Sequence, residues 1–252
     1  MNKRNDITPY IAVKDGALTI AACVTALQQV FETVIVGVDT NTKDNTEEIC
    51  RNLGAVVIPV TWTGFAQTKN FIAAQASTDW VLSMDADEVL NQELMESLFQ
   101  VSLQPNVQYA FNRMSYVGTV AFRHSGWHPD WVTRLYNRYD AKWNTNLVHE
   151  GLMTDQLAHV VKLNGLVHHY SYTDFDQVYT KFDIYARLRA MEWTKSGKKP
   201  YFIKKLFGPT FRFFKTFILR RGFLDGSNGL KLAKAEYWLK RKEMEYFDKL
   251  QK

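Results

Sequence analysis

Three short runs of apolar, largely β-branched residues alternate with helical patterns in the first half of the chain. The runs are TVIVGVD (33–39), AVVIPV (55–60) and WVLSMD (80–85). Unbroken apolar runs of this length are typical of parallel strands buried on both faces, which right-handed crossover helices connect. The alternation therefore predicts an α/β fold built on an open, twisted, mostly parallel sheet flanked by helices.

The segments between these runs have the periodicity of amphipathic helices. One apolar helix face is formed by Ile20, Cys23, Val24, Leu27 and Phe31. Further along, Asp44 with Glu47 three residues later resembles a capping box for a helix that ends near Gly54. We expect these helices to supply the crossover connections.

After residue 105 the pattern becomes irregular. Segments such as YAFNRMSYV (109–117) and KLNGLVHHYSY (162–172) predict antiparallel strands and long loops packed on the sheet. Thr173 and Asp176 are then expected to cap a long helix that stops near Gly197. Its predicted buried face consists of Phe175, Val178, Phe182, Tyr185 and Ala186. We therefore expect a catalytic core in residues 1–172 and a C-terminal helical extension in residues 173–252.

Length, cysteines and charge limit the class of protein further. A chain of 252 residues can bury a sizeable core, and Cys23 and Cys50 lack the spacing of metal ligands, which favours buried thiols in a reducing compartment. No signal-peptide core and no run of about 18 apolar residues is present, so we expect a cytoplasmic protein that does not span the membrane. The net charge of +5 divides into −7 for residues 1–180 and +12 for residues 181–252, so the basic end is expected to meet an anionic surface.

Acidic residues follow two of the predicted strands directly. Asp39 ends the first apolar run, and the last run is followed by Asp85, Asp87 and Glu88. Ligands of open parallel sheets bind beyond the carboxyl ends of the strands, so these acids point to the expected crevice. Two carboxylates one residue apart can reach a single Mg²⁺ or Mn²⁺ ion, and such an ion keeps sites for the phosphate oxygens of a departing diphosphate. A DxD pair is otherwise most often a solvated acidic turn, and its position at a strand end favours the metal site here.

Asp39 is a candidate for nucleobase binding. A carboxylate at that strand end can accept a hydrogen bond from the N3 hydrogen of a uracil ring. The alternative is a turn residue that accepts from nearby backbone groups. The acidic pair at the matching edge of the same sheet favours the binding role.

Several motifs in a fixed order resemble those of the family 2 glycosyltransferases. They are VIVGVDTNTKDNTEEI, the segment GAVVIPV to SMDADEVL, GWHPDWVTRLYN, VHEGL, HHYSYTDFDQVYTKFDIYA and RRGFLDGSNGL, and together they extend over roughly residues 10–235. The pattern is most similar to the small bacterial enzymes that resemble lipopolysaccharide core β-1,4-glucosyltransferases. The resemblance implies a GT-A-like (Rossmann-like) fold, a nucleotide-diphosphate sugar donor, a divalent metal (Mn²⁺ or Mg²⁺) and inverting transfer to a hydroxyl acceptor.

The resemblance also implies roles for individual residues at the donor site. Asp39 would contact the nucleobase with Val13 beside it, and Asp85 would lie near the ribose and the metal. Asp87 would be the principal metal ligand, and His169 resembles the late histidine that completes the metal or diphosphate site. Lys69 and Arg134 would contact the diphosphate, or else form a structural ion pair. The sequence departs from the family at its start, where YIAVKDG is short and offers Lys14 and Asp15.

For the catalytic base the resemblance implies Asp130 in GWHPDW. An inverting transferase needs one carboxylate that takes the proton of the acceptor hydroxyl. Trp127 and Trp131 would stack against sugar faces, and His149 would contact the acceptor. Two alternatives stay open: Glu150 is the rival base or holds the acceptor, and Pro129 with Asp130 merely starts a helix.

Residues 201–223, YFIKKLFGPTFRFFKTFILRRGF, interleave aromatic and basic side chains. On a helix, Phe207, Phe211, Phe214 and Ile218 form one stripe. Such a helix either lies in an anionic membrane interface or packs on the core with a solvated basic face. Nucleic acid is not an expected partner, because no known nucleic-acid-binding module is present and residues 1–180 are acidic.

Together these observations predict a metal-dependent hexosyltransferase, most simply of glucose from UDP-glucose, that acts on a lipid-linked or cell-envelope glycan. We expect it in the cytoplasm, with peripheral association on the inner face of the cell membrane. The alternatives are a sugar-phosphate nucleotidyltransferase and a non-catalytic nucleotide-sugar-binding scaffold on the membrane. The first usually has a Gly-rich, basic loop after the first strand, which VKDGALTI lacks.

Overall fold

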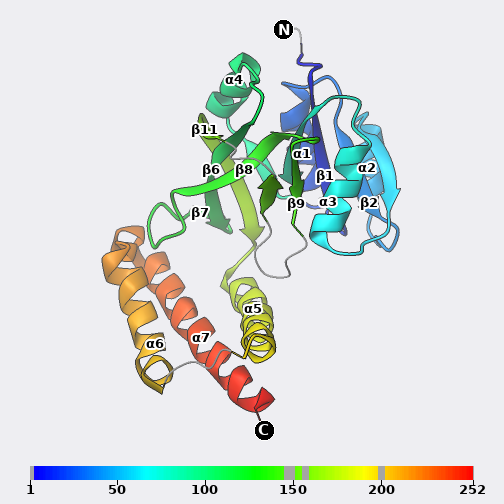
Figure 1. Cartoon of the computed structure of the whole chain (residues 1–252). Coiled ribbons are helices and arrows are strands. Elements are labelled where there is room, and N and C mark those ends of the chain that lie inside the picture. The colour runs from blue at the N-terminus through cyan, green and yellow to red at the C-terminus, as the bar shows by residue number, and fades with distance from the viewer. Residues whose placement is uncertain (1–2, 145–150, 155–158, 198–201, 252) are drawn as a thin grey trace. The chain divides into compact units, whose positions relative to one another are not determined.

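Four parallel strands form one half of the sheet, and three of them coincide with the predicted apolar runs (Figure 1). The structure is a computed structural model that describes residues 3–144, 151–154, 159–197 and 202–251. The four strands are β1 (Ile7–Val13), β2 (Ile35–Asp39), β3 (Val56–Val60) and β4 (Trp80–Asp85). They lie side by side in the order β3-β2-β1-β4, and every pair among them is parallel.

The other half of the sheet is largely antiparallel, as expected for the irregular second half of the chain. Beyond β4 the order continues β8-β6-β11-β5, and β7 pairs with β6. These strands are β5 (Glu88–Leu90), β6 (Val107–Val117), β7 (Val120–Ala121), β8 (Asp130–Asn137) and β11 (His159–Tyr172). A separate pair consists of β9 (Ala141–Trp143) and β10 (Leu152–Thr154). The expected α/β fold class is confirmed.

Helices cover both faces of the parallel half. α1 (Ile20–Gln28), α2 (Thr46–Asn52) and α4 (Gln92–Gln100) pack on one face, and α3 (Phe65–Ala74) packs on the other. Neighbours on β1 show the alternation, because Tyr10 belongs to the cluster under α3 and Ile11 to the cluster under α1. Burial on both faces explains the apolar runs of β2 and β4, whereas β3 lies at the edge of the sheet and is only partly buried. The predicted face of α1 and both cysteine thiols are buried, as expected.

Two helix starts differ from the sequence prediction by a residue or two. α2 begins after Asn45, while the carboxylate of Asp44 accepts from the backbone N–H of Thr46 at 3.0 Å and forms a local turn. α5 (Phe175–Lys195) is capped by Asp174, which accepts from the backbone N–H of Gln177 at 2.9 Å. Adjacent Asp, Asn and Thr residues are all competent caps, so the sequence alone does not choose among them.

The chain divides into two compact units. The first, here called the sheet unit, contains residues 1–113 and 130–169, and the second, the helical unit, contains residues 114–129 and 170–252. Besides α5, the helical unit has α6 (Phe202–Phe214), a π-helical segment (Lys215–Leu219), a 3₁₀ turn (Gly222–Asp225) and α7 (Gly226–Leu250).

α7 packs against both α5 and α6 within the helical unit (Figure 1). The core of this unit is formed by Val117, Phe122, Val178, Phe182, Leu232 and Ala235. Tyr185, predicted on the buried face of α5, is instead about half exposed. Among the helices that the structure describes, none has the length and apolar character needed to cross a bilayer.

Candidate active site

The carboxyl ends of β1, β2 and β4 meet at one edge of the sheet. Val13 pairs with Val38 of β2, and Ala12 pairs with Asp85 of β4, so Asp39 and Asp85 end strands that lie on either side of β1. The chain changes its winding direction between β1 and β4, which is where open α/β sheets bind ligands. The structure therefore places the two acids where the sequence predicts them.

Asp39 is a buried and ionised acid at this edge. Its Oδ1 accepts from the backbone N–H of Asn41 at 3.0 Å and from the side-chain amide of the same residue at 3.3 Å. Its Oδ2 lies 3.7 Å from the ammonium nitrogen of Lys14. The hydrogen bond from the Asn41 backbone, together with Lys14, holds the pKa of Asp39 below its usual value. Asp39 thus closes a local turn with one oxygen and faces an exposed cation with the other.

Asp85 is held by two cations. Its Oδ1 lies 3.0 Å from Nζ of Lys69 on α3, and its Oδ2 lies 2.7 Å from a guanidinium nitrogen of Arg134 on β8. Burial alone raises the pKa of Asp85, but the charges of Arg134 and Lys69 outweigh it and hold the pKa well below its usual value. Asp85 is therefore a fixed anion. Lys69 and Arg134 each form an ion pair with Asp85, and their contact with a diphosphate stays a prediction.

Glu88, which the sequence left without a role, lies directly behind Asp85. Its side chain is fully buried, and its Oε2 accepts from the backbone N–H of Asp85 at 3.0 Å. Its Oε1 lies 2.5 Å from Arg134 and 3.5 Å from Arg113. The two facing carboxylates outweigh the effect of burial and raise the pKa of Arg134. Glu88 therefore fixes both the backbone and the ionic partner of Asp85.

Asp130 is the first residue of β8, not the start of a helix. In the strand register it stands opposite Arg113 of β6, whose Nε and Nη2 donate to its Oδ2 at 2.9 and 2.7 Å. The backbone N–H of Asp130 donates to the side chain of Asn112 at 3.2 Å. The carboxylate is 38% exposed, so a solvent-side molecule can reach it. Cross-strand pairing thus orients an accessible acid.

Six charged side chains connect these positions in one alternating series. In order they are Lys69, Asp85, Arg134, Glu88, Arg113 and Asp130, and we call them the ion-pair network. Three cations balance three anions, and the middle members, Arg134 and Glu88, are the most buried. Buried charges are tolerated when each is paired and hydrogen-bonded, and a complete series satisfies that condition. The network joins the end of β4 to the start of β8.

Sequence reasoning missed Arg113 as a member of this network. The available signal was a lone arginine in a strand whose preceding residues, from Val107 to Phe111, are all buried. A charge at such a position needs a partner. Its partners lie 17 and 25 residues away in sequence, and only the strand pairing reveals which acids they are.

Asp87 and His169 lie close together at the same edge. The Nε2 atom of His169 lies 3.4 Å from Oδ1 of Asp87, and His169 is the register partner of Glu88 on β5. Its neighbour His168 is half-buried, and burial lowers the pKa of that imidazole. A carboxylate and an imidazole are suitable ligands for a divalent cation. The pair fits a metal, whereas both oxygens of Asp85 already accept from cations.

In the part of the chain that the structure describes, no group of three or more His, Cys, Asp and Glu side chains gathers closely enough to enclose a metal. The two side chains at this edge would therefore hold a metal only together with oxygens from a bound ligand. Mg²⁺ and Mn²⁺ are usually bound in this way, by one or two carboxylates and substrate phosphates.

The residues expected to bind the acceptor fall into different parts of the molecule. Trp131 on β8 is 38% exposed in the sheet unit, with Nζ of Lys162 at 4.6 Å from its ring centroid. Trp127 belongs to the helical unit, where it stacks on Tyr172 at 5.7 Å between ring centroids. His149 and Glu150 lie outside the described residues. The acceptor roles of these residues stay predictions.

Two of the sequence motifs meet in the helical unit. Asp225 of RRGFLDGSNGL accepts from the backbone N–H groups of Arg123 and His124 at 3.3 and 3.2 Å and from the Ser125 hydroxyl at 2.7 Å. Gly126, with φ 83°, lies under the side chain of Arg220, and an added Cβ would come within 2.3 Å of it. Asp225 therefore fixes the loop that precedes Asp130 in the sequence.

Comparison with known proteins gives consistent results. The model of the family "Glycosyl transferase family 2" matches residues 10–159. An uncharacterised glycosyltransferase of Rickettsia felis is 30% identical over 237 residues, which cover 88% of this chain and 82% of that protein. The lipopolysaccharide core biosynthesis glycosyltransferase LpsC of Rhizobium meliloti is 25% identical over 242 residues, which cover 90% and 88% of the two chains.

Among solved structures, glucosyl-3-phosphoglycerate synthase from Mycobacterium tuberculosis, in complex with Mn²⁺, UDP and glucosyl-3-phosphoglycerate, aligns with a TM-score of 0.48 and 15% identity. The alignment covers 77% of this chain and 81% of that one. A structure of Staphylococcus aureus TarS covers 97% of this chain and 92% of that one with a TM-score of 0.42 and 14% identity.

Proposed function

Because the chain belongs to glycosyltransferase family 2, we propose that it transfers a hexose, most simply glucose, from a UDP-sugar to a hydroxyl group of a lipid-linked or cell-envelope glycan with inversion. The similarity to LpsC, a glycosyltransferase of lipopolysaccharide core biosynthesis, supports this class of acceptor. One observation carries the proposal. The ion-pair network ties the acid at the donor edge, Asp85, to an accessible acid, Asp130.

At the donor edge, Asp39 and Val13 would bind the uracil ring. Asp39 is ionised and can accept the N3 hydrogen of uracil, and Val13 ends the neighbouring strand. Asp87 and His169 would hold the divalent metal, with Asp85 behind them. Such a metal would stabilise the negative charge that develops on the departing diphosphate.

At the other end of the network, Asp130 would act as the general base. It takes the proton of the acceptor hydroxyl while that oxygen forms a bond to the anomeric carbon of the donor sugar. The bond between the anomeric carbon and the diphosphate oxygen breaks, and its electron pair leaves with UDP. Attack opposite the leaving group inverts the anomeric configuration.

Arg113 would be a positioning residue in this reaction, because it holds Oδ2 of Asp130 with two donors. We expect Arg113→Met to lower turnover by about tenfold, because Asp130 loses its orientation. The KM for the donor is expected to change less. Arg113→Lys keeps a cation and is expected to recover part of that loss. Equal turnover in the Met and Lys variants would contradict a positioning role.

The experiment that tests the donor assignment is a thermal-shift panel of UDP-sugars, other nucleotide sugars and nucleoside triphosphates, each with and without Mn²⁺. A ligand of the native state raises stability by mass action, by roughly 2.7 kcal/mol at a concentration of 100 times its Kd. We expect a UDP-sugar with Mn²⁺ to give the largest shift and Asp87→Asn to abolish the Mn²⁺-dependent part. If no UDP-sugar stabilises the protein in a metal-dependent way, the donor assignment is wrong.

A further inference from the structure

The segment from α6 to the 3₁₀ turn presents an unusual concentration of large apolar side chains to solvent. Eight of them are 42–60% exposed: Leu206, Phe207, Phe211, Phe214, Ile218, Leu219, Phe223 and Leu224. We call them the apolar face. The four residues predicted to form a stripe at helical spacing all belong to it, so none of them is packed in a core. A concentration of exposed apolar side chains of this kind is typical of an interaction site.

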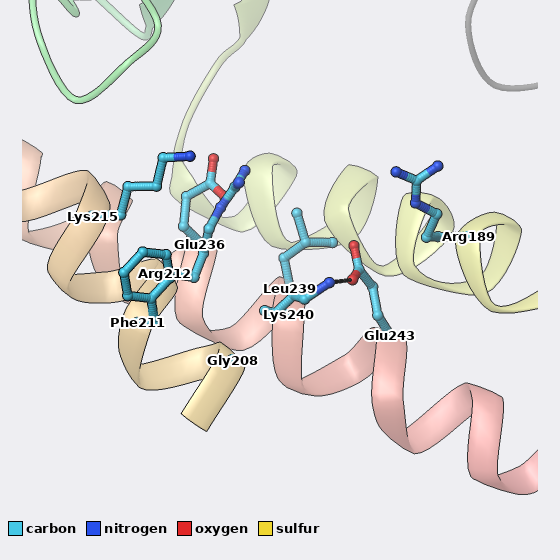
Figure 2. A pocket seen from close by; sticks show the side chains of 9 residues that line it. All are labelled: Arg189, Gly208, Phe211, Arg212, Lys215, Glu236, Leu239, Lys240 and Glu243. Atoms are coloured by element: carbon cyan, nitrogen blue, oxygen red, sulfur yellow. Dashed lines mark hydrogen bonds and ion pairs between the residues drawn. The ribbon is translucent and has the colours of Figure 1, made fainter. Parts of the chain in front are cut away.

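Other cations around α6 are paired within the unit. A cavity of about 380 Å³ lies among α5, α6 and α7, and Phe211 and Lys215 line it together with Arg212, Glu236, Lys240 and Glu243 (Figure 2). Arg212 pairs with Glu236 at 2.6 Å, and Lys240 pairs with Glu243. Arg212 and Lys240 are therefore already paired with carboxylates of the helical unit.

Two cations of the same segment have no such partner. Lys215 begins the π-helical segment, and Arg221 is exposed just before the 3₁₀ turn. Neither forms an ion pair with any carboxylate within the described residues. An apolar face with nearby unpaired cations is complementary to a partner that has an apolar interior beneath a layer of negatively charged groups.

We propose that the apolar face docks on a lipid membrane with anionic headgroups. The aromatic and aliphatic side chains would enter the boundary between headgroups and acyl chains, while Lys215 and Arg221 would meet the headgroup phosphates. The helix would lie in the plane of the interface, because no described helix is long and apolar enough to span a bilayer. The charge of +12 in residues 181–252 favours an anionic over a neutral surface.

Co-sedimentation of the purified full chain with vesicles tests this proposal without donor or metal. One set of vesicles contains phosphatidylcholine alone, and the other contains phosphatidylcholine with phosphatidylglycerol. We expect binding to the anionic vesicles that weakens as salt is raised, and at least about tenfold weaker binding to the neutral ones. Equal binding to both sets, or no binding to either, would overturn the proposal.

Two double variants separate the apolar and the charged contributions. Phe207→Glu with Phe214→Glu, and Lys215→Glu with Arg221→Glu, are each expected to reduce the partition coefficient on anionic vesicles by about tenfold or more. Phe99→Glu is the matched control, because Phe99 is a 44% exposed aromatic residue at the end of α4 in the sheet unit. It is expected to bind as the wild type does. Far-UV circular dichroism of each variant establishes that it is folded.

Other occupants of the apolar face give distinguishable results. A second copy of the chain would appear in light scattering as a dimer that the Phe207→Glu, Phe214→Glu variant dissociates, with no vesicle binding by the wild type. A nucleic acid would give binding to a fluorescent oligonucleotide that the vesicles do not compete. Either result would replace the membrane as the partner.

Discussion

The sheet unit and the helical unit use charge in opposite ways. In the sheet unit, Lys69, Arg134 and Arg113 alternate with three carboxylates in a network of paired charges. In the helical unit, Lys215 and Arg221 lie close in sequence to the exposed residues Phe214 and Phe223 and form no ion pair with a carboxylate in the described chain. The first arrangement fixes geometry inside a fold, and the second leaves charge available for an external surface.

This difference has an energetic basis. A buried ion loses several kcal/mol of solvation that only close partners offset, so the most buried members of the network, Arg134 and Glu88, depend on their ion pairs. An exposed cation retains its hydration, and a surface ion pair contributes at most about 1 kcal/mol. We therefore expect substitutions in the network to affect stability strongly, and substitutions of exposed charges in the helical unit to affect it little.

The largest expected effect on stability comes from breaking the centre of the network. Arg134→Met leaves the buried carboxylate of Glu88 and the partly buried carboxylate of Asp85 without their shared cation, which we expect to lower the free energy of unfolding by about 3–5 kcal/mol. The matched control is Arg187→Met, which removes an exposed arginine paired with Asp183 at 2.9 Å. Its expected loss is below about 1 kcal/mol. Urea denaturation of both variants gives the comparison, and similar losses would contradict it.

A smaller loss of stability is expected when a methyl group is added inside the helical unit, and it tests how tightly that interior is packed. A Cβ added at Gly229 of α7 would lie 1.8 Å from the backbone oxygen of Gly222. We expect Gly229→Ala to cost about 1–3 kcal/mol through this overpacking. Gly208→Ala on α6 is the control, because its added Cβ would lie 3.8 Å from the nearest side-chain atom.

Thermal denaturation measures both glycine variants. The change for Gly208→Ala is expected to stay within about 1 kcal/mol, since no atom has to move. If Gly229→Ala melted at the wild-type temperature, the packing between the 3₁₀ turn and α7 would be less tight than its geometry indicates.

A further predicted effect on stability depends on pH and appears only in acid. The pKa of Asp85 in the folded protein lies well below the ordinary value of 3.8. Its ionised form therefore contributes stability that is complete above the unfolded value and is lost as the pH falls below it toward the folded one. Melting temperatures of the wild type and Asp85→Asn, measured from neutral pH to about pH 2.5, test this. We expect the difference in melting temperature between the two proteins to become smaller only below about pH 4. A constant gap would show that the carboxylate of Asp85 has no such role.

The parts of this molecule that follow local rules could be predicted from its sequence. The parallel strands were visible as apolar runs, and the placement of Asp39 and Asp85 at one edge follows from the parallel direction of those strands. The outward stripe on α6 was visible in its spacing, although the sequence left open whether it packs on a core. Its exposure in the structure decides that question for these residues.

Pairings between distant segments could not be predicted in the same way. Asp225 contacts residues about 100 positions earlier, and the role of Arg113 depends on the register between β6 and β8. The sequence contains the charged residues but not the partner of each. The predicted helix starts differ from the observed ones by a residue or two, because neighbouring residues, such as Asp44 and Asn45, have almost equal capping preference.

The most direct test of the proposed chemistry is the rate of UDP release by Asp130→Asn, with UDP-glucose as donor and an envelope glycan fraction as acceptor. Asp140→Asn, an exposed acid on the turn after β8, is the matched control. We expect Asp130→Asn to keep the UDP-sugar thermal shift but to lose at least about 100-fold in turnover, the usual contribution of a general base. Turnover near that of the wild type, with donor binding intact, would contradict the assignment and transfer the role to Glu150.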